Sequence, residues 1–234
     1  MKVSKDSQTA LKTIQDAKNI GLLVGNSAST DAISAAMALY HLLTGEGGKI
    51  TPIVPGKIPN EARSLPASTE IKDNFGPKNL VVTLNTNQTP IEKVSYKAEG
   101  DKFKLVIHPL ERAFEVESVE YSYEGLNFDL LITLGVKKLS DLGDLYEKNR
   151  AEFSKNVIIN LDVSSQNENY GQINLVDPSK SSVSELLFHQ LLAWELVPSK
   201  EVAQCLLTGL ASAAPAIKPT EVPVVSSDPR SLSN

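Results

Sequence analysis

The chain has 234 residues, of which 41% are hydrophobic and 22% are charged, and its formal net charge is −5. That length accommodates one large α/β domain with an appendage, and that composition is ordinary for a globular protein. The acidic balance argues against general binding of duplex nucleic acid or of an anionic membrane. The chain starts without an apolar leader segment and has no run of ~18 apolar residues, so we expect a cytoplasmic protein that makes no membrane contact.

The beginning of the chain predicts a helix and then a strand, loop, helix and strand. Apolar residues at helical spacing indicate a helix over 7–19, and a short apolar strand follows at 20–24. A loop rich in Gly, Ser and Asn at 25–30 leads into a helix at 31–44 and a strand at 50–54. This order is a βαβ unit, which implies that the two strands pair in parallel.

The middle of the chain changes character. Residues 80–84 are expected to form a further apolar strand, but the stretch 94–123 alternates apolar and polar residues, as strands half-exposed to water do. Gly100 lies between two such strands and predicts a hairpin turn. We therefore expect an antiparallel β-meander at 94–123, inserted into the sheet or attached to its edge.

The remainder predicts alternating strands and helices as far as residue 214. Apolar strands are expected at 130–134, 157–161 and 173–176, and helices at 139–149, from the Ser181–Ser182 cap to about Glu195, and at 200–213. The expected fold class is α/β, a mainly parallel sheet with helices on both faces, over residues 1–214. Residues 215–234 are rich in Pro and Ser and are expected to form a flexible tail.

One long string carries a family resemblance. Residues 157–185 read VIINLDVSSQNENYGQINLVDPSKSSVSE. This resembles the DHH phosphoesterase family, where a strand leads through Asp-His-His, Asn-x-x-Phe/Tyr-Gly and Asx-Leu-Val-Asp-Pro to a Ser-Ser/Thr helix start. Residues 21–39 (GLLVGNSASTDAISAAMAL) and 128–143 (FDLLITLGVKKLSDLG) resemble two further family motifs. The resemblance extends to about residue 214. The family includes RecJ-like exonucleases and nanoRNase/pAp phosphatases.

The resemblance also implies a damaged metal site. The family holds two Mn²⁺ or Mg²⁺ ions through carboxylates and histidines of these motifs. The positions that match lost ligands are Gly25, Ser29, Gly135, Val163, Ser164 and Ala213, whereas Asp31 and Asp162 keep a carboxylate. Gly, Val and Ala have no ligating side chain, and a Ser hydroxyl is a poor neutral ligand for a hard cation. We therefore expect no metal, no other cofactor and no catalytic residue.

The remaining polar residues have two interpretations each. Asp31 is either a residual metal ligand or a cap of the helix that it begins. Asp162 follows a strand at the edge where α/β sheets place their sites, and it is either a site residue or a vestige. A set of serines could bind an anion through backbone N–H groups without metal, or could merely cap helices and shape loops: Ser27, Ser29, Ser164, Ser181 and Ser182.

Three functions follow from these alternatives. The leading hypothesis is a pseudoenzyme, a catalytically inactive binding or scaffold protein that acts through an unknown protein partner or through self-association, with the exposed meander as a docking edge. The second is a metal-free module that binds a nucleotide or short oligonucleotide. The third is a phosphoesterase acting on nucleotides or short oligonucleotides with a reduced site, Asp31 and Asp162 holding Mn²⁺ or Mg²⁺.

Overall fold

The chain folds as two compact units. The structure, a computed structural model, describes residues 4–44, 48–76, 79–87, 89–114, 119–124 and 128–214. One unit combines Met1–Asn74 with Phe128–Asn234, and the other is Phe75–Asn127. The expected flexible tail at 215–234 lies outside the described residues. The second unit therefore interrupts the sequence of the first.

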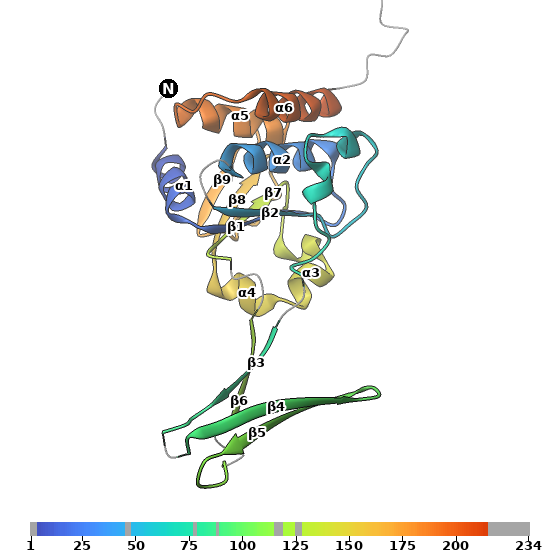
Figure 1. The fold of residues 1–234 in the computed structure, drawn as a ribbon. Coiled ribbons are helices and arrows are strands. Elements are labelled where there is room, and N and C mark those ends of the chain that lie inside the picture. The colour runs from blue at the N-terminus through green and yellow to red at the C-terminus, as the bar shows by residue number, and fades with distance from the viewer. Residues whose placement is uncertain are drawn as a thin grey trace, which may run out of the picture. The chain divides into compact units, whose positions relative to one another are not determined.

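The first unit is built on a five-stranded parallel sheet (Figure 1). Its strands, in the order β2-β1-β7-β8-β9, are Lys49–Ile53, Asn19–Val24, Leu130–Leu134, Val157–Asp162 and Ile173–Val176. Every neighbouring pair is parallel, and β7 is buried along its whole length. Apolar strands of this kind belong to a sheet covered on both faces. The predicted α/β class with a mainly parallel sheet is confirmed.

Helices cover both faces of that sheet (Figure 1). On one face lie α2 (Thr30–Thr44), α5 (Val183–Ala193) and α6 (Lys200–Ala213), and on the other lie the short helices α3 (Asp144–Glu147) and α4 (Arg150–Lys155). The first helix, α1 (Lys5–Asp16), is tied to the end of α5, since Trp194 Nε1 donates to the Ser7 carbonyl at 2.9 Å. No helix in the described ranges is long and apolar enough to span a bilayer.

One predicted helix is wrong. The expected helix at 139–149 is divided into η4 (Leu139–Leu142) and α3, and α4 begins at Arg150. Gly143 lies at the break with φ 57° and ψ −134°, a conformation that favours glycine and that no helix contains. Two further short 3₁₀ helices, η1 (Glu61–Ser64) and η2 (Ser68–Glu70), follow β2.

The second unit contains two separate antiparallel ladders. One pairs β3 (Asn79–Leu84) with β6 (Val119–Glu124), and the other pairs β4 (Ile91–Glu99) with β5 (Lys102–Pro109). The hairpin turn at Gly100 is confirmed, with φ 55° at that residue.

The arrangement of these strands differs from the expected meander. Among the described strands, none of the second unit pairs with the five-stranded sheet, so the insertion adds no strand to that sheet. The second unit also includes more of the sequence than 94–123, because residues 80–84 lie in β3, which pairs with β6. The apolar composition of β3 resembles that of a buried parallel strand, yet most residues of β3 are exposed.

Candidate functional site

An open cleft lies at the carboxyl edge of the parallel sheet. From β1 the chain moves to β2 on one side, and later strands continue through β7 on the other side. Such a switch point opens a crevice outside the strand ends, where α/β proteins bind ligands. The cleft has a volume of about 760 Å³ and is lined by residues from the loops after β1, β7 and β8, among them Gly25–Ser27, Gly135 and Gln166.

Asp31 lies at the start of α2 and caps a different helix. Its side chain is buried, and both carboxylate oxygens accept hydrogen bonds from the first turn of α5, Oδ2 from Val183 N–H at 2.7 Å and Oδ1 from Ser184 N–H at 2.9 Å. The N-terminus of α2 has its own cap, because Ser29 Oγ accepts from Ala32 N–H at 3.1 Å. Asp31 therefore joins α2 to α5, which neither interpretation of the sequence had included.

Asp162, at the end of β8, holds the loop that follows that strand. The residue is buried, and Oδ1 accepts from Val163 N–H at 2.8 Å. Oδ2 accepts from the Asn167 side-chain amide, also at 2.8 Å. The same amide donates to the Val136 carbonyl after β7 at 3.0 Å. Asp162 and Asn167 together therefore connect the loops after β7 and β8, both of which line the cleft.

A network of side-chain amides lies beside this pair. Asn160 Nδ2 donates to Asn167 Oδ1 at 2.8 Å and to Asn174 Oδ1 at 3.1 Å, which links β8, the following loop and β9. The Tyr170 hydroxyl lies 2.8 Å from Thr133 Oγ1 and donates to the loop after β7. Burial raises the pKa of Tyr170 far above its usual value, so its hydroxyl remains a donor at any ordinary pH. The Asn-x-x-Tyr-Gly string thus has a structural role here.

Two glycines, Gly135 and Gly25, occupy positions where the family has metal-ligating side chains. Gly135 has φ 64°, and a Cβ there would lie 3.0 Å from Ala32 Cβ, so an aspartate at this position would be strained. Gly25 is buried at the end of β1, and a Cβ there would meet the Asp141 carbonyl at 3.7 Å, an ordinary contact. Strain therefore opposes a ligating side chain at Gly135 but not at Gly25.

The other predicted positions are scattered. Val163 is half-buried and packs against the hydrophobic core, and Ser164 Oγ accepts from Gln166 N–H at 3.1 Å within its own loop. Ser27 is exposed and lines the cleft. Ala213 is exposed at the last position of α6. The structure thus brings Gly25, Ser27 and Gly135 to the cleft, whereas Ala213 lies at a helix end.

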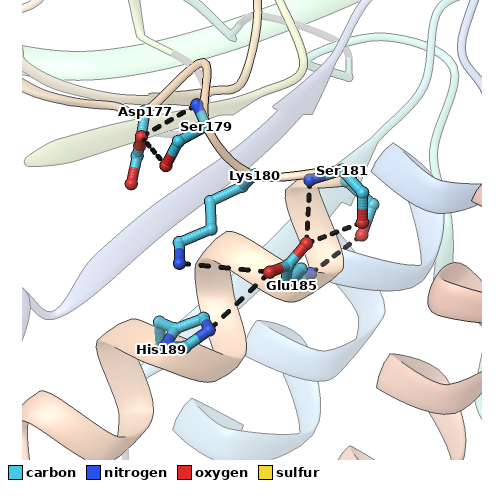
Figure 2. Close-up of polar contacts among 7 residues, drawn as sticks. Asp177, Ser179, Lys180, Ser181, Glu185 and His189 are labelled. Carbon is cyan, nitrogen blue, oxygen red and sulfur yellow. Dashed lines mark hydrogen bonds and ion pairs between the residues drawn. The ribbon is translucent and has the colours of Figure 1, made fainter.

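Ser182 is the N-cap residue of α5, and Ser181 lies beside it in contact with Glu185 (Figure 2). Ser182 Oγ accepts from Glu185 N–H at 2.9 Å, and the Glu185 carboxylate accepts from the Ser181 backbone N–H at 2.8 Å and from its hydroxyl at 2.6 Å. Hydrogen bonds from Ser181 hold the pKa of Glu185 below its usual value, with smaller contributions from the charges of Lys180 and His189. This arrangement is a variant of the capping box.

The first-turn donors of α5 are therefore all used within the chain. Val183 and Ser184 N–H bind Asp31, and Glu185 N–H binds Ser182. An external anion would have to displace two carboxylates that already complement the helix dipole. The structure thus favours helix capping over anion binding at Ser181 and Ser182.

The cleft also contains charged residues that the sequence motifs did not indicate. Lys137 and Lys138 follow β7, Asp141 lies a few residues further on, and Glu168 comes from the loop after β8. The two lysines are exposed, and their charges are balanced by the two acids. Their only signal in the sequence is that they come shortly after a buried strand.

The residues present do not fit a pair of divalent ions. A bridged two-metal centre needs several charged ligands around ions about 3.5–4 Å apart. At the family's ligand positions this chain offers two carboxylates, Asp31 and Asp162, and each of their oxygens already accepts a hydrogen bond from the protein. Within the described part of the chain, no three His, Cys, Asp or Glu side chains gather as a metal site would require.

Comparison with solved structures shows that other proteins share this fold. No protein-family model and no curated protein matches the chain. Among solved structures, an exopolyphosphatase-related protein from Bacteroides fragilis has a similar fold, with a TM-score of 0.62 and 19% sequence identity. The similarity covers 89% of this chain and 49% of that one, so the chain spans about half the length of this relative. At this level of identity the likeness shows the fold alone.

The capping role of Asp31 can be tested by replacing it. Asp31→Ala leaves two buried N–H groups of α5 without their acceptor, so we expect the free energy of unfolding to fall by about 2–4 kcal/mol. Urea denaturation followed by circular dichroism measures this change. Asp141→Ala, which removes a carboxylate that lines the cleft, is the matched control and should change stability by about 0.5 kcal/mol or less.

An Asp31→Ala variant that is as stable as the wild type, or more stable, would have a different explanation. A carboxylate kept for a ligand is commonly a burden on the fold, and its removal leaves stability unchanged or increases it. Unaltered or greater stability of Asp31→Ala would therefore contradict the capping role.

Proposed function

We propose that this chain is a non-catalytic binding or scaffold protein, a pseudoenzyme built on a DHH phosphoesterase-like fold. The observation that carries the proposal is that both carboxylate oxygens of Asp31 bind the first turn of α5. A residue committed in this way stabilises the fold and is poorly placed to bind a metal ion. Asp162 supports the same conclusion, because its two oxygens bind Val163 and Asn167.

The relation to the DHH family rests on two kinds of support. The first is the string that runs from Asn167 through Tyr170-Gly171 to 174–178, whose amides and hydroxyl connect β8, β9 and the loop after β7. The second is the fold that the chain shares with an exopolyphosphatase-related protein. A protein that keeps its fold after losing hydrolytic activity is expected to lose metal-ligating residues while the residues that stabilise the fold remain.

The chemistry of hydrolysis explains why the missing ligands matter. Metal-dependent phosphoesterases use the ions to generate a hydroxide at neutral pH and to neutralise the charge that develops on the phosphate oxygens. Gly135 has no side chain to provide such a ligand, and its φ of 64° disfavours any residue that does. The cleft nevertheless remains open, so a binding function does not require the lost chemistry.

A specific observation favours a second candidate, metal-free binding of a nucleotide or short oligonucleotide. The cleft volume of about 760 Å³ is in the range of small-molecule sites, and Lys137 and Lys138 supply positive charge at its border. Phosphate groups bind lysine through charge-assisted hydrogen bonds. Asp141 and Glu168 oppose this attraction, so selectivity would come from shape as well as charge.

The pseudoenzyme proposal is tested by hydrolysis assays on the full chain. We expect no Mn²⁺-dependent release of phosphate or mononucleotide from pAp, bis-p-nitrophenyl phosphate or a short oligonucleotide above a protein-free blank, because the two carboxylates are engaged in the fold. Asp162→Asn, which keeps one acceptor oxygen, should behave identically. Metal-dependent turnover by the wild-type chain that disappears in Asp162→Asn would overturn the proposal and support the reduced-site phosphoesterase.

The binding candidate is tested separately by calorimetry in the absence of divalent metal. We expect pAp or a dinucleotide to bind, and Lys137→Glu with Lys138→Glu to weaken binding at least about tenfold, because two phosphate contacts become repulsive. Lys155→Glu, at the end of α4 and not among the residues lining the cleft, is a control for charge reversal outside the cleft and should leave the affinity unchanged. Flat titrations with the wild-type chain would reject nucleotide binding while leaving the pseudoenzyme proposal intact.

A further inference from the structure

The β4–β5 hairpin of the second unit separates apolar and polar residues onto its two faces. Cross-strand pairs share a face, and the pairs that the ladder forms are Val94 with Ile107, Tyr96 with Leu105 and Ala98 with Phe103. These six residues form what we call the apolar hairpin face. It contains no charged side chain.

The reverse face has the opposite character. Its cross-strand pairs are Lys93 with His108, Ser95 with Val106, Lys97 with Lys104 and Glu99 with Lys102. Glu99 pairs with both Lys97 and Lys104, and the hydrogen bonds from these lysines hold the pKa of Glu99 below its usual value. The reverse face is thus suited to water, which leaves the apolar hairpin face as the side that needs a cover.

The apolar hairpin face is exposed in the structure. The exposed fractions are 74% for Tyr96, 68% for Phe103, 54% for Val94 and 50% for Leu105. With about 200 Å² for a whole large side chain, these four leave on the order of 500 Å² of surface in contact with water. That equals a typical largest apolar patch on a monomeric protein, which is often functional.

In the described residues, the exposed side chains of the other ladder are not buried against this face. Leu80 and Tyr121, on the cross-strand pairs of β3 and β6, are themselves 58% and 70% exposed. A two-stranded ladder is marginally stable in water by itself, and it gains stability when its apolar face packs on another layer. Among the described residues of the second unit, no other layer packs on the apolar hairpin face.

We infer that this face binds the same face of a second copy of the chain, so that two hairpins stack as a small β-sandwich around a twofold axis. The inference is independent of the cleft. Pairing two copies covers on the order of 1,000 Å² in total, the lower limit of specific interfaces. Since the face has no charge, two copies meet without repulsion, and their lysines remain on the outer surfaces.

The aromatic pair is the anchor of this interface. The rings of Tyr96 and Phe103 are diagonal neighbours on the two strands of the hairpin, with centroids 5.7 Å apart and planes 23° apart. The stacked rings hold each other in place, and exposed aromatic residues of this kind contribute most of the binding energy in many interfaces. Stacked sheets lie about 10 Å apart, a distance that these large side chains fill.

Sedimentation equilibrium of the full chain tests the inference. We expect a reversible dimer with a dissociation constant of about 1–100 μM, as the small area implies. Tyr96→Lys combined with Phe103→Lys should weaken it at least about tenfold. Val106→Lys is the matched control, since Val106 is an exposed apolar residue of the same hairpin on the reverse face, and it should leave dimerisation unchanged. A wild-type chain that stays monomeric overturns the inference, as does a double variant that dimerises as tightly as the control.

A second measurement keeps the wild-type face intact, in case the double variant loses its hairpin. A spin label at Lys97→Cys, in a chain whose single cysteine is removed by Cys205→Ala, reports the separation of two hairpins by dipolar coupling. Stacked sheets predict an intermolecular distance of about 20–40 Å, set by the sheet spacing and two label arms. A dimer without coupling in this range would use another surface and would overturn the inference.

Discussion

The structure of the first unit depends on the buried carboxylate of Asp31. Helix starts leave backbone N–H groups without intrahelical partners, and burying such donors unsatisfied destabilises a fold by several kcal/mol, about 1–3 for each. Asp31 supplies an acceptor to two donors of α5 and places a negative charge where the helix dipole favours it. One side chain thereby fixes α2, which follows the first strand, to α5, which follows the last.

The same principle shapes the edge of the sheet where the cleft opens. Asp162 and the amides of Asn160, Asn167 and Asn174 bind one another and the neighbouring backbone, so the loops keep a defined conformation. A network in which each member is satisfied is rigid and specifies one arrangement. Polar contacts within the protein therefore connect the loops that border the cleft.

The sequence predicted those parts of the fold whose physics is local. Strands 130–134 and 173–176 and the helix at 200–213 were located correctly, because buried parallel strands are apolar runs and helices have capped, periodic patterns. The prediction of a continuous helix at 139–149 was wrong because the spacing of apolar residues does not reveal the positive φ of Gly143. The partner of Asp31 was missed because it lies far along the chain, and the cleft lysines were missed because no motif marks them.

Our central proposal is that Asp31 and Asp162 stabilise the fold and do not bind metal. It is tested most directly by elemental analysis of the purified full chain after dialysis against micromolar Mn²⁺. The account predicts a metal content well below one ion per chain, with no difference between the wild type and Asp162→Asn. Stoichiometric binding of two ions per chain that is lost in Asp162→Asn would contradict it, since a dinuclear centre needs these oxygens for itself.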